Sequence, residues 1–212
     1  MTSKFDAQSD RDLIDLAAGH PLAWLCSSGA NGLQATPLPL LLKHDDAAGG
    51  RLVAVEGHFA RSNPQVEALR RSPDALVLWM GVQGYVSPSW LSDRTQAPSW
   101  NYASAQCRVR VQFLDNDETA LTAHLDELAR RFEAGRPSAW SVAEMGARLQ
   151  LLSQRVIAFR AEVVELRERY KLGQDERDDV FGELLHGLQG AGDADPLADW
   201  MRRFNPGRRA LS

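Results

Sequence analysis

A short segment beside a predicted helix start carries a cation suited to anion binding. Residues 58–64 read HFARSNP, and Arg61 lies two residues before Asn63, which with Pro64 is typical of a helix start. The first turn of a helix presents unpaired N–H groups and the positive end of the helix dipole. A phosphate near Arg61 would therefore be bound by a charged side chain and by amide donors. The alternative is an exposed arginine beside a well-capped helix.

A second segment, residues 85–102 (YVSPSWLSDRTQAPSWNY), concentrates aromatic side chains among two prolines and four serines. Its aromatic residues are Tyr85, Trp90, Trp100 and Tyr102. Because proline and serine interrupt helices and strands, we expect a loop here. Aromatic rings offer flat faces, which suit the planar ring of a cofactor or a dimer interface. Core filling beneath a lid loop is the third possibility.

Other chemical patterns are missing from the chain. The histidines are His20, His44, His58, His124 and His186, and they share no metal-ligand spacing. Ser87 and Ser89 are the candidate nucleophiles, but neither lies in a G-x-S-x-G sequence. Neither G-x-G-x-x-G nor GK[ST] occurs, so the usual nucleotide-binding loops are excluded. We therefore expect no metal ligands and assign no catalytic residue.

Composition points to a globular protein with a real core. The chain has 212 residues, of which 44% are hydrophobic and 25% charged, and its formal net charge is -4. This charge would repel a phosphate polymer, so nucleic-acid binding would need a local basic patch such as residues 167–171 (RERYK). The arginines of the tail form a second basic cluster: Arg202, Arg203, Arg208 and Arg209.

The remaining compositional features concern location. Residues 1–10 lack the apolar centre of a signal peptide, and no apolar run is long enough to span a bilayer. We therefore expect a cytoplasmic protein with no membrane association. Cys26 and Cys107 are isolated in predicted strands, so we expect buried, reduced thiols.

Hydrophobic periodicity predicts the elements that must position these residues. The predicted strands are residues 22–28, 33–42, 51–60, 75–81 and 106–114, and a long, bent strand from Val156. The predicted helices are residues 10–18 and those that begin at Pro64 and after Asp117, Ser141 and Asp175. Since strands and helices do not alternate as βαβ units, the pattern favours an antiparallel, barrel-like sheet with helices outside. Periodicity is lost after Gly190, so we expect one domain over residues 1–190 and an irregular tail over 191–212.

Several motifs in one order resemble the PaiB-like family of FMN-binding negative transcriptional regulators. HFARSNP, GYVSPSW, PSWNY and KLGQ follow one another at the spacing of that family, over about residues 1–190. The matching positions are His58, Ala60, Arg61, Asn63 and Pro64, Tyr85 to Trp90, Pro98, Trp100 to Tyr102, and Lys171, Leu172 and Gln174.

The resemblance implies an α+β fold: an antiparallel split β-barrel of the FMN-binding, pyridoxamine-phosphate-oxidase-like type with peripheral helices. It also implies a homodimer with FMN in a cleft formed by both subunits. The phosphate partners would be Arg61 and Lys171, the polar contacts Ser87 and Gln174, and the residues that shape the slot Tyr85, Trp90, Trp100 and Tyr102. Asn63 and Asn101 complete the implied cofactor-binding set.

The chain departs from the family pattern near the end of this set. Gly173 and Asp175 stand where the family has serine and asparagine, and Val82, Leu91 and Ser99 are further departures. Loss of the serine hydroxyl removes a donor beside Lys171, and Asp175 with Glu176 adds negative charge. These changes predict FMN binding that is weaker than the family pattern would give, or no FMN binding.

Three functions follow from this resemblance. A negative regulator would bind DNA, although no helix-turn-helix is apparent. A flavin-dependent sensor would need only the cofactor. A flavin-dependent oxidoreductase acting on a small molecule with NAD(P)H is the alternative. Because the flavin carries the redox chemistry, the protein need supply only a cleft that binds it.

Overall fold

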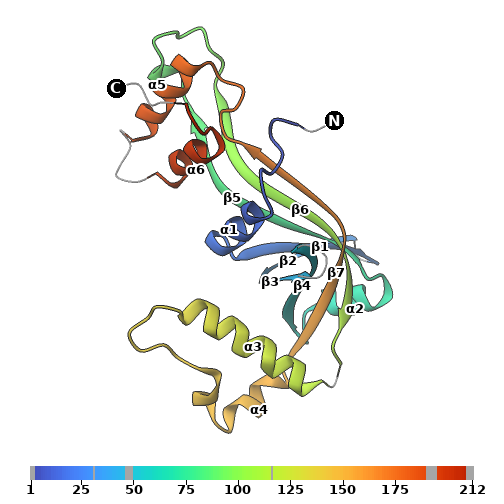
Figure 1. Ribbon diagram of the computed structural model, residues 1–212. Coiled ribbons are helices and arrows are strands. Elements are labelled where there is room, and N and C mark those ends of the chain that lie inside the picture. The colour runs from blue at the N-terminus through green and yellow to red at the C-terminus, as the bar shows by residue number, and fades with distance from the viewer. Residues whose placement is uncertain (1–2, 31, 46–49, 116, 190–194, 209–212) are drawn as a thin grey trace. The chain divides into compact units, whose positions relative to one another are not determined.

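The computed structural model describes residues 3–30, 32–45, 50–115, 117–189 and 195–208 (Figure 1). Its strands are β1 (Leu22–Gly29), β2 (Gly32–Pro39), β3 (Leu41–Asp45), β4 (Arg51–Ala60), β5 (Asp74–Val86), β6 (Ser99–Phe113) and β7 (Val156–Lys171). Its α-helices are α1 (Arg11–Gly19), α2 (Pro64–Arg71), α3 (Glu118–Glu133), α4 (Arg148–Ser153), α5 (Asp178–Gln189) and α6 (Pro196–Phe204). Two short 3-10 helices are η2 (Pro88–Trp90) and η3 (Val142–Met145).

The strands form one sheet in the order β2-β1-β5-β6-β7-β4-β3. The pairs β1–β2, β1–β5, β3–β4 and β4–β7 are antiparallel. Side chains alternate between the two faces of a strand, and along β6 Cys107, Val109 and Val111 are buried whereas Arg108 and Arg110 are exposed. The predicted α+β class is therefore confirmed, and β6 has one buried apolar face and one exposed polar face.

The described residues fall into two compact units, and the division crosses β5, β6 and β7. Unit 1 comprises Met1–His20, Trp79–Ala105 and Arg167–Ser212. Unit 2 comprises Pro21–Leu78 and Gln106–Leu166.

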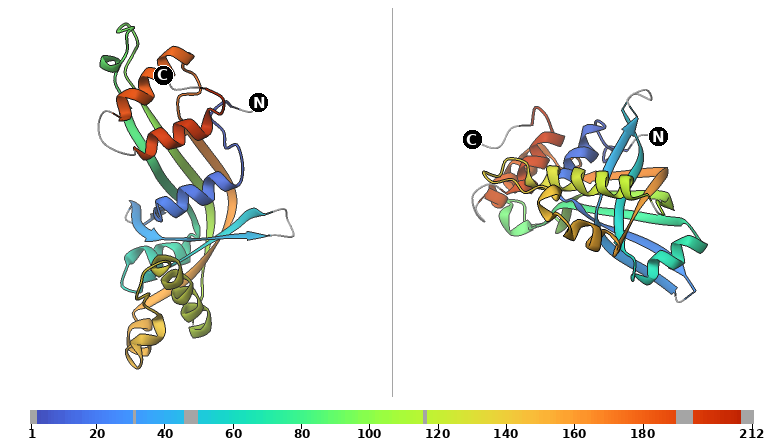
Figure 2. Two further views of the ribbon diagram at one scale, coloured as in Figure 1. Left: turned by 60° about the vertical axis from the view of Figure 1, so that its left-hand side comes forward. Right: turned by 90° about the horizontal axis from the view of Figure 1, so that it is seen from below.

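In unit 1, helices α1, α5 and α6 lie on one side of the strands (Figure 2, left). Glycines on β5 allow this close packing. A Cβ atom at Gly84 would lie 2.8 Å from Leu197 of α6, and one at Gly81 would overlap Leu16 of α1. A larger residue at either position would therefore require the leucine side chain of the helix to shift.

In unit 2, a buried glutamine joins α2 to the β1–β2 hairpin. Gln65 is 1% exposed, and its Nε2 atom donates hydrogen bonds to the Leu25 carbonyl (3.0 Å) and to Ser27 Oγ (2.9 Å). Its Oε1 atom accepts from Thr36 Oγ1 at 2.6 Å. The side chain is thus fully paired, as burial of an amide requires.

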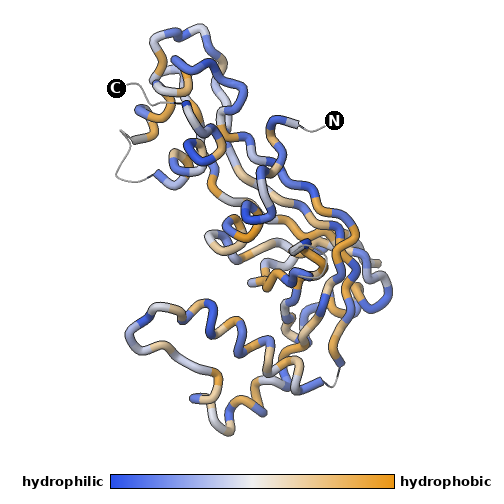
Figure 3. The backbone as a smooth tube through the Cα atoms, viewed as in Figure 1, coloured by the Kyte–Doolittle hydropathy of each residue, from blue (hydrophilic) through white to orange (hydrophobic). Residues whose placement is uncertain are grey.

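The helical insertion between β6 and β7 also belongs to unit 2. Polar and apolar residues alternate along α3 (Figure 3), and its buried positions are Leu121, His124 and Leu128. Asp117 caps this helix as predicted, accepting from the Ala120 N–H at 2.8 Å. Among the described residues, no helix is long and apolar enough to cross a membrane.

The predicted loop over residues 85–102 is confirmed for residues 87–98 but was wrong at both ends. β5 extends to Val86 and β6 begins at Ser99, so Tyr85, Trp100 and Tyr102 lie on strands. Pro88 lies beyond the end of β5, where no backbone N–H is needed to pair with a neighbouring strand. The aromatic residues are accommodated because one face of these strands is open to solvent.

The prediction of an irregular tail over residues 191–212 was also wrong. Residues 196–204 form α6, which begins with Asp195 as N-cap and Pro196 in the first turn. Leu197, Met201 and Phe204 follow at helical spacing and are buried. The parts of the tail at 191–194 and 209–212 lie outside the described residues.

Candidate functional site

An exposed aromatic and cationic surface covers the side of unit 1 that faces away from α1 and α6. Gly84, Asn101 and Tyr170 contact α6. Because neighbours along a strand point to opposite faces, the residues next to them point the other way, and these are Tyr85, Trp100, Tyr102 and Arg169. We call these last four residues the open face. It brings together three aromatic residues that the sequence singled out.

The rings of the open face contact each other and a cation. Tyr85 and Trp100 meet nearly edge to face, with centroids 6.2 Å apart and planes at 62°. They are 47% and 53% exposed, so both keep a free ring surface. Arg169 Nε donates a hydrogen bond to the Tyr102 hydroxyl at 3.2 Å. A flat ring and an anionic group could therefore both find partners here.

Lys171 adds a second cation at the end of β7. Its ammonium group donates to Ser99 Oγ, at the first residue of β6. Lys171 lies two residues beyond Arg169, the spacing that places two side chains on the same face of a strand. Arg169 was absent from the predicted set, although this two-residue spacing in RERYK was the signal that could have identified it.

Ser87 and Gln174 have local partners. Ser87 Oγ accepts from the Ser89 N–H at 3.1 Å and so caps η2. Gln174 Oε1 accepts from the Leu172 N–H at 2.7 Å, and its Nε2 donates to the Tyr170 carbonyl at 2.6 Å. Both side chains therefore shape turns, and their contact with a cofactor stays a prediction.

Trp90 and Asn101 point toward helices. The Trp90 indole packs on Gly187 of α5, where a Cβ atom would lie 2.5 to 2.7 Å from the ring. Asn101 is 1% exposed and its Nδ2 donates to Met201 Sδ of α6 at 3.5 Å. Since Asn101 lies between Trp100 and Tyr102, strand alternation alone places it on the opposite face. The role of both residues in cofactor binding stays a prediction.

Arg61 belongs to unit 2 and follows β4. It borders a hollow of about 230 Å³ whose lining includes Leu121, Ala158 and two acidic residues, Asp117 and Glu118. Its own backbone N–H donates to the Arg155 carbonyl at 2.8 Å, which fixes the chain at the edge of this hollow. An anion in the hollow would meet one cation and two carboxylates.

Asn63 confirms the predicted helix start. Its Oδ1 accepts from the Gln65 N–H at 2.9 Å, and its Nδ2 donates to Thr36 Oγ1 at 3.0 Å. Both ends of the amide are used within unit 2, so the capping role is established and the cofactor role stays a prediction.

The thiols and the acidic groups offer no further chemistry. Cys26 and Cys107 are free; Cys107 is buried, whereas Cys26 is partly exposed rather than buried as predicted. Burial raises the pKa of the Cys107 thiol to about 12, so the reactive thiolate is disfavoured. Within the part of the chain that the structure describes, no three His, Cys, Asp or Glu side chains gather at metal-binding distance.

Solved structures of low sequence identity share the fold. The flavocytochrome Anf3 from Azotobacter vinelandii superposes with a TM-score of 0.57 at 14% identity, over 80% of this chain and 70% of that one. The FAD and heme binding protein from Mycobacterium smegmatis gives 0.56 at 21% identity, over 82% and 78%. The chain thus has the α+β, antiparallel split β-barrel fold that the sequence predicted.

Sequence similarity then identifies the family. The family model described as "Putative FMN-binding domain" matches residues 1–165, and the chain belongs to this family. The chain is 30% identical over 158 residues to the protease synthase and sporulation protein PAI 2 of Bacillus subtilis (strain 168), covering 73% of this chain and 72% of that protein. The resemblance to the PaiB-like family is confirmed.

The open face, together with Lys171 two residues beyond Arg169, fits the chemistry of FMN. An isoalloxazine ring needs flat apolar surface, which Tyr85 and Trp100 offer, and a phosphate needs cations, which Arg169 and Lys171 offer.

The presence of glycine instead of the family's serine at position 173 has a local cause. Gly173 has φ +86°, and a Cβ atom there would lie 3.1 Å from the Phe181 ring, so a serine would be strained.

Proposed function

We propose that this chain binds FMN on the open face of unit 1. Tyr85, Trp100 and Tyr102 would hold the ring system, and Arg169 and Lys171 the phosphate. The observation that carries the proposal is the gathering of half-exposed aromatic rings beside Arg169 on one strand face. Arg61 belongs to unit 2, and its implied role as a phosphate partner stays a prediction.

Bound FMN would supply one- and two-electron redox chemistry. The protein residues have simpler roles. The aromatic rings would exclude water from one side of the flavin, and the cations would bind the phosphate and set its position.

Titration of the purified full chain with FMN tests the proposal. We expect quenching of flavin fluorescence and a shifted visible spectrum at micromolar FMN, because stacking on tyrosine and tryptophan alters the ring environment. Wild-type protein that leaves FMN fluorescence unchanged at these concentrations would refute it.

A homodimer is part of the same proposal, and apolar side chains on the β1–β2 hairpin of unit 2 support it. Leu22, Trp24 and Leu33 are 59%, 50% and 90% exposed, and the register Trp24↔Pro37 with Ser28↔Leu33 places them on one face. Contiguous exposed apolar surface is typical of interfaces.

Replacement of one of these residues tests the dimer. We expect Trp24→Glu to convert a dimer to a monomer in light-scattering measurements of molar mass. The matched control is Trp140→Glu, because Trp140 is 42% exposed on the helical insertion and should leave the mass unchanged. A monomeric wild type would contradict the dimer.

The use of the flavin leaves two candidate functions. Kinship with PAI 2, named a sporulation protein, supports a regulatory or sensing role. A salt-dependent gel shift on DNA upstream of the chain's own gene tests the regulatory role, and a lack of DNA binding at low salt would count against this role.

The exposure of Tyr85 and Trp100 supports an oxidoreductase instead, since a small electron acceptor could reach a flavin ring bound beside them. Bleaching of the bound flavin on anaerobic mixing with NAD(P)H would favour the oxidoreductase.

A further inference from the structure

Residues 195–208, which we call the carboxy-terminal segment, belong to unit 1 and lie beyond the family model, which ends at residue 165. Helix α6 buries Leu197, Met201 and Phe204. Met201 Cε would lie 3.2 Å from a Cβ atom at Gly173, and Leu197 packs at Gly84. The segment therefore contacts both β5 and the turn that follows Lys171.

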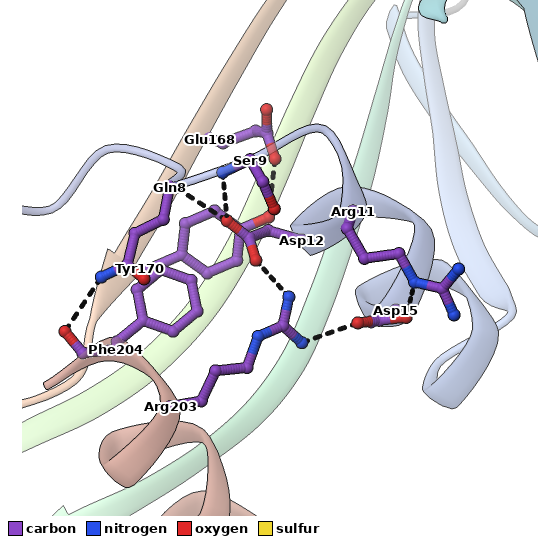
Figure 4. A network of polar contacts seen from close by, with 9 residues as sticks. All are labelled: Gln8, Ser9, Arg11, Asp12, Asp15, Glu168, Tyr170, Arg203 and Phe204. Carbon is purple, nitrogen blue, oxygen red and sulfur yellow. Dashed lines mark hydrogen bonds and ion pairs between the residues drawn. The ribbon is translucent and has the colours of Figure 1, made fainter. Parts of the chain in front are cut away.

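A buried ionic network anchors α6 to the amino-terminal segment (Figure 4). Arg203 bonds Asp12, which is 1% exposed, and donates to Asp15 Oδ2 at 2.7 Å. Asp12 Oδ2 also accepts from the N–H groups of Gln8 (2.7 Å) and Ser9 (2.9 Å). The buried carboxylate is fully paired, which is the condition under which a buried charge is tolerated.

An aromatic stack links the same helix to β7. The Tyr170 ring lies 4.7 Å from Phe204 and 5.9 Å from Trp200, with planes inclined by 22° and 10°. Tyr170 immediately precedes Lys171, so α6 packs directly on the backbone that carries this candidate phosphate partner.

The carboxy-terminal segment also bonds the turn after Lys171, residues 172–177. Asn205 Nδ2 donates to the Leu172 carbonyl at 3.0 Å. The Arg208 guanidinium donates to the Gly173 carbonyl at 2.9 Å and to the Glu176 carbonyl. The same guanidinium bonds Asp178 Oδ1 at 2.7 Å and lies 4.7 Å from the centre of the Phe181 ring. One side chain thus holds both ends of the turn.

We propose that Arg208 is a positioning residue, which fixes the 172–177 turn so that Lys171 is presented to the FMN phosphate. This inference rests on the proposed function. Lys171 has a long flexible stem, and its placement depends on the backbone from which it extends. Gly173 adds backbone freedom to the turn, so the turn needs external partners to keep one conformation.

Affinity for FMN compared with riboflavin, which lacks the phosphate, tests this role. We expect Arg208→Ala to weaken FMN binding about tenfold, the loss of roughly one charge-assisted contact, and to leave riboflavin binding unchanged. The matched control is Arg202→Ala, since the Arg202 side chain bonds Asp199 (2.9 Å) on its own helix and should affect neither ligand.

Hydrogen exchange of the ligand-free chain provides a second readout. Amides of residues 172–177 should exchange faster in Arg208→Ala than in wild type or Arg202→Ala, while those of β5 and β6 stay unchanged. Unaltered exchange of the turn, or equal loss of affinity for FMN and riboflavin, would overturn the positioning role. A wild type that binds no FMN would instead overturn the proposed function and, with it, the phosphate contact of Lys171.

Discussion

Arg169 Nε donates a hydrogen bond of 3.2 Å to the hydroxyl of Tyr102, across β6 and β7. The bond places a guanidinium at the edge of an exposed aromatic surface, on the strand that also carries Lys171. Arg169 also lies 4.7 Å from the centre of the Phe5 ring, which fixes the side chain from a second direction. A cation held in this way loses little conformational freedom when it binds an anion.

Removal of this cation should weaken FMN binding through charge. We expect Arg169→Ala to lower FMN affinity roughly 10-fold at low salt and less at high salt, because screening weakens the interaction that has been lost. Titrations at two salt concentrations measure it. Tyr102→Phe keeps the ring and should have a smaller effect. Equal affinity of wild type and Arg169→Ala at low salt would remove Arg169 from the site.

A buried histidine pair in unit 2 should make stability depend on pH. His58 Nδ1 and His124 Nε2 lie 3.1 Å apart, and burial lowers the pKa of both, that of His124 to about 4. The groups around the pair are Glu56, Glu127 and Lys43. Because the folded pKa lies below the unfolded value of about 6.5, the stabilisation is present above pH 6.5 and is lost as pH falls toward 4.

Urea unfolding at pH 7 and pH 5 measures this loss. His124 alone should contribute about 2 kcal/mol less to the free energy of unfolding at pH 5. In His124→Gln the free energy of unfolding should depend less on pH than in wild type. Replacement of the exposed His186 by glutamine should leave the pH dependence as in wild type. A profile that is the same in His124→Gln and wild type would contradict a neutral buried pair.

The glycine that replaces the family serine should be required in this chain. Gly173 and Gly207 both have positive φ (86° and 87°), but only Gly173 has side chains, Phe181 and Met201, at the position of a Cβ atom. Gly173→Ser should therefore destabilise the fold by about 2 kcal/mol, and Gly207→Ser by about 1 kcal/mol. Thermal unfolding compares the two. Equal effects would mean that contacts with α5 and α6 do not constrain the turn.

Much of the fold could be predicted from local patterns. The period of two in residues 106–114 predicted β6, and Asp117 with Leu121 and Leu128 predicted α3, because these elements bury one side. Residues 85–86 and 99–102 were misassigned as loop because the serines and prolines between them outweighed the exposed aromatic residues of these two strand ends. α6 was missed since its buried face has only three large apolar residues, although Asp195 and Pro196 gave a start signal.

The candidate site was predicted only in part. The motif residues Tyr85, Trp100 and Tyr102 do share a face, but Asn101 has the opposite orientation, which strand alternation would have shown once the segment was recognised as a strand. The role of Arg208 could not be found from the sequence, because the three acceptors in and after the turn, on Gly173, Glu176 and Asp178, lie 30 to 35 residues away and two of them are backbone carbonyls.

Flavin titration of tryptophan variants tests most directly whether the open face binds FMN. Trp100 and Trp140 are both exposed, at 53% and 42%, but only Trp100 lies on the open face. Wild type and Trp140→Ala should quench FMN fluorescence with the same micromolar affinity, and Trp100→Ala should bind about tenfold more weakly, as expected from loss of roughly 1.4 kcal/mol of ring contact. Equal affinity of Trp100→Ala and wild type would contradict the assignment of FMN to this face.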